Sequence, residues 1–349
     1  MKKIKSITIL SIMTALALTA CSSNTPSDTD NTDVDILYTK IGALSANLYN
    51  RGLPAAVSNG FIYYMGTDGY YEYDPVDKTS AKVYDLSESN SEEGERKICP
   101  QYNVVDNGFV VGEKGKVQYL NYNGEVLSEY DFPECEINEW LYAYEDRFYH
   151  IDHVFDTKTE KSTRLFDESD GGGQGLFYEL SEDWYIRVVP GYGYYEKISL
   201  KDNDAKVQTI ELSDEFGYVC SVAVDLNSDI YINSLDEDKD IKTLYKIDAE
   251  TNKTEVVDIA EETFVFAVLN GNIAYMDYYV GGENDNLYYN DTLVSDNVFR
   301  FTLLNEKYII YTVQIITGTD EFGITRYTED VYLYDIENGS TEQLKTVTK

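Results

Sequence analysis

The chain has 349 residues, of which 63 are acidic and 28 are basic, so its formal net charge is −35 at neutral pH. A charge of this sign and size opposes binding to nucleic acid and to anionic lipid headgroups. The 33 tyrosines and the many β-branched residues exclude a chain that is disordered throughout.

The first twenty residues have the order of an export signal. Lys2, Lys3 and Lys5 form a basic start, and an apolar stretch of about fifteen residues, too short for a comfortable membrane span, runs to Ala20. The stretch ends in LTAC, an aliphatic residue, two small residues and Cys21, and so resembles the lipobox of bacterial lipoproteins. The resemblance implies cleavage before Cys21, acylation of that residue and anchoring on the extracytoplasmic face of the cell membrane. An ordinary secretory signal with an incidental cysteine is the alternative.

The segment after the cysteine, SSNTPSDTDNTD, contains no apolar side chain except one proline, which predicts a flexible tether. We therefore predict a signal peptide at 1–20, a lipidated cysteine and tether at 21–33, and one domain at 34–349. The sequence leaves open whether the envelope has one membrane or two.

A pattern of short strands repeats along the rest of the chain. In each of seven units a turn residue precedes an apolar strand, and a later strand commonly ends in Asp, Asn or Ser. The turn residues, on average about 41 positions apart, are Asn59, Asn107, Asp146, Asp183, Asn227, Asn270 and Asn305. The strand-ending residues are Asp74, Asn121, Asp156, Ser199, Asp248, Asn290 and Asp335. A period near forty with only strand signals predicts propeller blades of four antiparallel strands.

We therefore predict an all-β fold, a single β-propeller of seven four-stranded antiparallel blades. Six or eight blades are alternatives, and a two-domain array of β-sandwiches is the second choice of fold. Tyrosine suits such blades because its ring packs between sheets while its hydroxyl reaches the rim or a neighbouring backbone group. Residues 34–42 form a spare strand, which completes the last blade or packs on the outside.

The segments IYYMGTDG and NLYYND resemble the strand–turn signature of YWTD-type propellers, with tyrosine in place of tryptophan. Residues 50–345 are more similar to the tyrosine-rich, propeller-like domains of unknown function in lipoproteins of low-GC Gram-positive bacteria. This resemblance implies a fold and a location, and it implies no activity.

Long connections mark the candidate site. Asn59 and Asp74 are 15 residues apart, whereas Asn305 and Asp335 are 30 apart, and the extra length falls between the second and third strands of a unit. These connections leave a four-stranded meander at one edge, where variable loops can form a binding surface; insertions that are merely tolerated are the alternative. The candidate ligand-binding residues are Tyr192, Tyr194, Tyr278, Tyr279, Phe322, Arg326 and Tyr327. Their rings could stack on sugars or peptide side chains, and the arginine could pair with a carboxylate.

Metal binding has little support in the sequence, and we expect no cofactor. The acidic run DEDKD carries Asp236, Asp238 and Asp240, but an EF-hand needs glycine and glutamate where Ile241 and Ile247 stand. A looser calcium loop stays an alternative to a solvated acidic loop.

The remaining cysteines and histidines lie in strand-like segments. Cys99, Cys135 and Cys220 are odd in number, which argues against a complete disulfide framework and favours buried thiols. If RFYHIDHVFD forms one strand, His150 and His153 face opposite sides of it and are poorly placed to share a metal ion.

These patterns indicate a membrane-anchored surface lipoprotein whose propeller binds an extracellular glycan, peptide or protein, or serves in assembly, without catalysis. The alternative is a propeller-fold glycan lyase or hydrolase that uses paired carboxylates. The sequence contains no nucleophile elbow, histidine cluster or phosphate loop.

Overall fold

The computed structural model describes residues 55–66, 69–85, 103–105, 108–135, 141–169, 175–181, 183–202, 205–212, 216–236, 241–258, 265–277, 285–319 and 325–344. All of them belong to one compact unit, Val34–Lys349. The predicted signal peptide, Cys21 and the tether lie outside the described residues.

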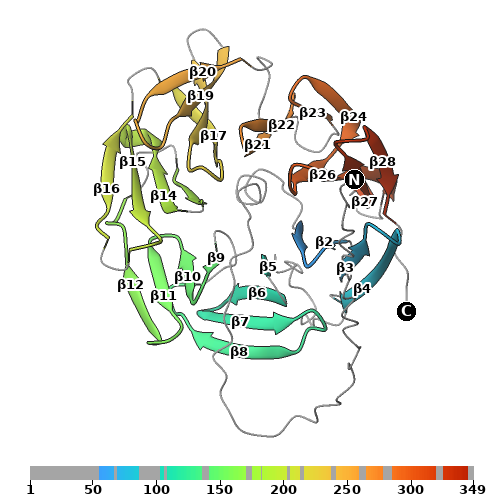
Figure 1. The fold of residues 1–349 in the computed structure, drawn as a ribbon, viewed down its shortest axis with the longest axis horizontal. Helices are drawn as coiled ribbons and strands as arrows, with labels where there is room; N and C mark the ends of the chain where they lie inside the picture. The colour runs from blue at the N-terminus through green and yellow to red at the C-terminus, as the bar shows by residue number, and fades with distance from the viewer. Residues whose placement is uncertain are drawn as a thin grey trace, which may run out of the picture. The chain divides into compact units, whose positions relative to one another are not determined.

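Seven four-stranded antiparallel sheets follow one another along the chain and surround a common centre, as Figure 1 shows. Blade 1 has β1 (Ala55–Ser58), β2 (Phe61–Met65), β3 (Gly69–Asp74) and β4 (Thr79–Asp85); blade 2 has β5 (Asn103–Val105), β6 (Gly108–Glu113), β7 (Lys116–Asn121) and β8 (Val126–Asp131); blade 3 has β9 (Leu141–Tyr144), β10 (Arg147–His150), β11 (His153–Asp156) and β12 (Lys161–Arg164); blade 4 has β13 (Phe177–Leu180), β14 (Trp184–Val189), β15 (Tyr194–Ser199) and β16 (Gln208–Glu211). Blade 5 has β17 (Tyr218–Val224), β18 (Ile230–Asp236), β19 (Ile241–Ile247) and β20 (Thr254–Val257); blade 6 has β21 (Val265–Leu269), β22 (Asn272–Met276), β23 (Asp285–Tyr289) and β24 (Thr292–Val298); blade 7 has β25 (Arg300–Leu303), β26 (Tyr308–Thr319), β27 (Thr325–Asp335) and β28 (Ser340–Gln343). The prediction of a seven-bladed propeller is confirmed.

Buried side chains join each blade to the next. Clusters of apolar residues in the described part of the chain connect blades 1 and 2, 2 and 3, and so on to blades 6 and 7. One further cluster joins Ile62 and Tyr64 of β2 to Ile310 of β26 and Leu333 of β27. The ring is therefore closed by packing between its first and last blades. The predicted closing strand at 34–42 lies outside the described residues.

The tyrosines fill the spaces between blades, as expected. Tyr63 of blade 1 stacks on Tyr122 of blade 2, with ring centroids 3.9 Å apart and planes 5° from parallel. Tyr185 of blade 4 is fully buried, and its hydroxyl donates to the Ile151 carbonyl of blade 3 at 2.7 Å. The ring supplies apolar contact area and the hydroxyl satisfies backbone polarity across the same interface.

The repeated strand-ending residues form turns that their own side chains hold. The Asp74 carboxylate accepts hydrogen bonds from the backbone N–H groups of Val76 and Asp77, at 2.8 and 3.2 Å. The Asp248 carboxylate accepts from Glu250 and Thr251, at 3.1 and 2.6 Å. Short polar side chains recur at these positions because they can cap the chain reversal between the third and fourth strands.

The Asn–Gly pairs form tight turns between first and second strands. Asn59 and Gly60 have φ values of 51° and 85°, and Asn270 and Gly271 have 49° and 75°. Two consecutive left-handed residues make the hairpin turn whose twist matches the flanking strands. Asp225 of blade 5, which is fully buried, accepts the N–H groups of Asn270 and Gly271 at 2.6 and 2.7 Å, and so ties two neighbouring blades together.

Candidate binding site

Each blade has two edges with different connections. Because its strands are antiparallel and in chain order, the turn from first to second strand leaves one edge and the connection from second to third leaves the other. We call the edge that carries the connections 190–193, 277–284 and 320–324 the loop edge. The opposite edge, which carries the Asn59–Gly60 and Asn270–Gly271 turns, is called the turn edge. These three connections of the loop edge are all second-to-third connections, and every candidate residue lies in one of them or in the first residues of the third strand that follows.

In blade 4 this connection contains a short 3-10 helix, η2 (Pro190–Tyr192). Gly193 follows at φ 69°, and its N–H donates to the Pro190 carbonyl at 2.9 Å, which closes the turn. Tyr192 is 57% exposed, whereas Tyr194, the first residue of β15, is half-buried. Of these two candidates, Tyr192 exposes the larger fraction of its side chain to solvent.

In blade 7 the connection differs from the predicted long loop. Strands β26 and β27 extend to Thr319 and Thr325, and backbone pairing joins Gly318 to Arg326 and Ile316 to Tyr327. Arg326 and Tyr327 therefore belong to a strand, because the segment TRYT is rich in the residues that favour extended backbone. The tip with Phe322 lies outside the described residues.

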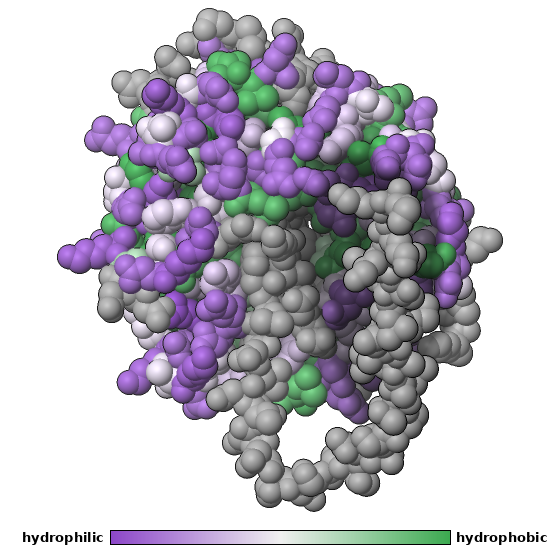
Figure 2. All heavy atoms as spheres, in the orientation of Figure 1, coloured by the Kyte–Doolittle hydropathy of each residue, from purple (hydrophilic) through white to green (hydrophobic). Residues whose placement is uncertain are grey.

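Ile315 and Ile316 of this hairpin are exposed, at 42% and 71%. Val126 and Leu127 of β8 form a second exposed apolar pair, at 51% and 46%. In the view of Figure 2, hydrophilic side chains cover most of the described surface and apolar areas are small.

In blade 6, Tyr278 and Tyr279 lie outside the described residues. The base of their connection is closed by Asp277 and Asn286, whose side chains form a hydrogen bond of 2.9 Å.

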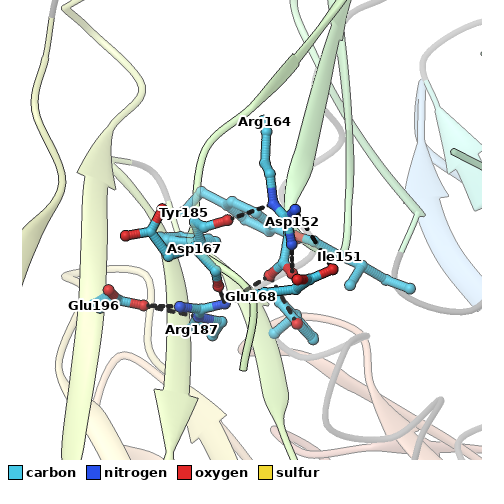
Figure 3. Close-up of polar contacts among 10 residues, drawn as sticks. Ile151, Asp152, Arg164, Asp167, Glu168, Tyr185, Arg187 and Glu196 are labelled. Atoms are coloured by element: carbon cyan, nitrogen blue, oxygen red, sulfur yellow. Dashed lines mark hydrogen bonds and ion pairs between the residues drawn. The ribbon is translucent and has the colours of Figure 1, made fainter. Parts of the chain in front are cut away.

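A buried cluster of charges lies between blades 3 and 4 (Figure 3). Arg187 of β14 is 1% exposed; its Nε donates to Glu196 at 2.8 Å, and one Nη donates to Asp152 at 2.8 Å and to the Asp167 carbonyl at 2.7 Å. The Tyr178 hydroxyl adds a hydrogen bond of 2.9 Å to Asp152. Burial alone would lower the pKa of Arg187, but the two carboxylates outweigh it and raise that pKa.

This cluster brings two carboxylates together, the arrangement that a glycosidase would need, but both are engaged by one guanidinium. It therefore fixes blade 4 against blade 3. The sequence pattern did not indicate it, although an arginine among buried residues in WYIRVV is a signal for an internal ion pair.

The two histidines occupy different strands from those expected. His150 ends β10 and His153 begins β11, and they lie directly opposite each other across a two-residue turn. The prediction that they face opposite sides of one strand was wrong, since directly opposed residues share a face. Among the described residues no group of three or more His, Cys, Asp or Glu is arranged to hold a metal ion. Asp238 and Asp240 of the acidic run lie outside the described ranges.

The two described cysteines, Cys135 and Cys220, form no disulfide and are fully or partly shielded from solvent. Cys135 is fully buried, and burial raises its pKa to about 12. Cys220 is half-buried, and burial raises its pKa as well. The expectation of a buried thiol is confirmed for Cys135, while Cys99 lies outside the described residues. No helix within the described ranges is long and apolar enough to cross a membrane.

No protein-family model matches this chain, and no curated protein matches it either. Solved structures do. Hsv2 of Kluyveromyces lactis is 6% identical, covers 84% of this chain and 99% of its own, and gives a TM-score of 0.47. Acylaminoacyl peptidase of Pyrococcus horikoshii is 12% identical over 87% of this chain and 54% of its own, with a TM-score of 0.48. The propeller domain of the Trilobed protease of Pyrococcus furiosus is 12% identical over 84% and 95%, with a TM-score of 0.42.

Proposed function

We propose that this protein is a lipid-anchored propeller on the extracytoplasmic face of a cell membrane. It binds a glycan, a peptide or a partner protein through the loop edge and does not transform what it binds. The proposal combines a cellular location, which the first twenty-one residues indicate, with a rigid closed scaffold.

The observation that carries the binding proposal is the contrast between tyrosines in strands and the tyrosine at the loop edge. Tyr73, Tyr185 and Tyr195 are at most 2% exposed, while Tyr192 is 57% exposed. An exposed aromatic ring in a short connection between two paired strands can stack on a sugar or a peptide side chain without a large loss of its own freedom. Loops on a rigid scaffold are the usual place for such contacts.

Binding is favoured over catalysis by how the buried charges are used. Asp152 and Glu196 bind Arg187, and Asp225 binds backbone N–H groups of the next blade. These carboxylates are engaged in holding blades together, which leaves them unsuited to the transfer of protons to a substrate.

The lipid anchor is tested by metabolic labelling with a fatty-acid probe in cells that produce the wild type or Cys21→Ala. The wild type should incorporate the probe and fractionate with membranes, and Cys21→Ala should do neither. Equal labelling of both chains would contradict the lipid anchor.

The binding face is tested by a glycan and peptide screen with the full chain and with a Tyr192→Ala/Tyr278→Ala/Tyr279→Ala/Arg326→Ala variant. We expect the variant to lose the interaction at nearly unchanged stability, because surface substitutions usually change stability by no more than about 0.5 kcal/mol. The control Val76→Ala changes a side chain that is 85% exposed between β3 and β4, at the turn edge. Undiminished binding by the quadruple variant would reject the loop edge.

A further inference from the structure

A cavity of about 520 Å³ lies between blades 3 and 4 and is open to solvent on one side. One wall is a row of residues directly opposed across three strands of blade 3, namely Arg147, Asp156 and Lys161. Blade 4 faces this row with Ser199, the last residue of β15, and with the connection that follows. Asp156 and Ser199 end third strands, so their end of the cavity lies at the turn edge, while Arg164 lies at the other end of β12. The lining contains none of the candidate residues of the loop edge.

The charges in the cavity differ from those of the chain as a whole. Three cations and two carboxylates line it, in a protein whose formal net charge is −35. The cations are Arg147, Lys161 and Arg164, and the carboxylates are Asp156 and Asp202. At physiological ionic strength, salt screens exposed charges that are more than about 8 Å apart. The charges that line the cavity, and not the net charge of the chain, therefore determine which ion binds there.

Lys161 and the terminal nitrogens of Arg164 form no hydrogen bond of good geometry with the described residues. Asp156 accepts from Thr159 at 2.8 and 3.0 Å and lies 3.9 Å from Arg147, while Lys161 is exposed and forms no ion pair with any described residue. Arg164 donates its Nε to a backbone carbonyl, and its terminal nitrogens lie 3.6 and 3.8 Å from carboxylate oxygens, beyond good hydrogen-bonding distance. Lys161 can therefore donate to an incoming anion, whereas Arg164 stands at the other end of β12, where its guanidinium lies beside Asp152 and Glu168.

The rest of the lining is apolar or carries hydroxyl groups. Val154, Leu165 and Ile198 supply aliphatic surface, and Thr163 lies opposite Val154 across the β11–β12 pair. A volume of this size is within the range of small-molecule pockets. The lining suits a compact ligand with one anionic group and a partly apolar body.

We propose that this cavity binds a small monocarboxylate, with Lys161 as the group that holds its carboxylate. An ammonium group donates charge-assisted hydrogen bonds to carboxylate oxygens. The three cations and two carboxylates of the lining leave one net positive charge, which a monoanion balances and which a phosphate monoester, with nearly two negative charges at neutral pH, exceeds. The carboxylate could belong to an acidic sugar or to the C-terminus of a short peptide.

Isothermal titration calorimetry on the full chain in detergent distinguishes these sources. Glucuronate is compared with glucose, acetyl-valine with acetyl-valinamide, and inorganic phosphate is a further probe. We expect millimolar binding of at least one carboxylate and none of its neutral counterpart. Lys161→Gln should weaken carboxylate binding about tenfold, because it removes one hydrogen bond from a charged donor. The matched control is Lys206→Gln, which removes the same charge from an exposed neighbour that does not line the cavity.

A second variant keeps every charge and fills the space. Ala205 lines the cavity, and Ala205→Trp should abolish binding while the thermal midpoint shows that the protein is folded. Four results would each overturn the proposal: no heat with either carboxylate, equal binding of a neutral counterpart, tighter binding of phosphate, or equal weakening by Lys161→Gln and Lys206→Gln. Because every candidate residue of the loop edge is unchanged in these variants, the outcome does not depend on the proposed function.

Discussion

Replacement of Asp225 by alanine should destabilise the whole ring. Its carboxylate is fully buried and accepts backbone N–H groups from Leu226 at 2.7 Å, Asn270 at 2.6 Å and Gly271 at 2.7 Å. Two of the three donors belong to the next blade, so alanine leaves two N–H groups without an acceptor at that interface. A hydrogen bond to a charged group contributes about 1.5 to 3 kcal/mol, and we therefore expect a loss of about 3 to 5 kcal/mol.

The assay is equilibrium urea denaturation, followed by far-ultraviolet circular dichroism. Asp248→Ala is the matched control, because Asp248 also accepts hydrogen bonds from two N–H groups but is only half-buried and serves a single turn. We expect the free energy of unfolding to fall much less in the control than in Asp225→Ala. If Asp225→Ala unfolds within about 0.5 kcal/mol of the wild type, the ordinary scatter of surface substitutions, the tie between blades contributes nothing.

Three further predictions follow from the core, the thiols and the turns. Ile62→Ala, at the junction of blades 1 and 7, should lower the free energy of unfolding by about 2 to 5 kcal/mol, and an unchanged urea midpoint would show that the ring is not closed there. At pH 8 an alkylating reagent should leave Cys135, whose pKa is raised by burial to about 12, unmodified in the folded protein, and rapid modification would contradict its burial. Hydrogen bonds from Thr251 to Asp248 and from Asn338 to Asp335 lower the pKa of both carboxyl groups below the ordinary 3.8. The two carboxylates therefore stabilise the folded protein above that pH, and this stabilisation is lost as the pH falls through their folded-state pKa values. The thermal midpoint should therefore drop on acidification below about pH 4, and less so in Asp248→Asn/Asp335→Asn; identical profiles would contradict this assignment.

The repeat could be predicted from the sequence because its signals are local. An Asp74 carboxylate that binds N–H groups two and three residues later needs nothing from the rest of the fold. The same holds for Asn59–Gly60, whose two positive φ values are adopted most readily by asparagine and glycine. Seven such signals in a regular order were enough to define the blades.

The histidine turn could not be predicted in the same way. Ile151 has a φ of 50°, a left-handed conformation that β-branched residues rarely adopt, so the sequence gives no turn signal there. The surrounding structure imposes it: the Tyr185 hydroxyl binds the Ile151 carbonyl, and Asp152 binds Arg187. Tertiary contacts thus override the local preference at this turn.

The cluster of charges around Arg187 could not be predicted from the sequence either. Arg187 contacts Asp152, 35 residues away, and the Asp167 carbonyl, 20 residues away, across a blade interface whose register no local pattern specifies. The long β26–β27 hairpin also escaped prediction, since its glycines suggested a loop whereas its backbone continues the ladder to Thr319 and Thr325.

The most direct test of the account measures binding and turnover of one ligand together. A ligand found in the glycan and peptide screen is incubated with the full chain, its dissociation constant is determined, and the ligand is then recovered and weighed by mass spectrometry. The account predicts saturable binding that Tyr192→Ala weakens, with the ligand recovered intact after prolonged incubation. Cleavage or elimination of the ligand by the wild type, absent in a heat-denatured sample, would contradict a purely binding propeller.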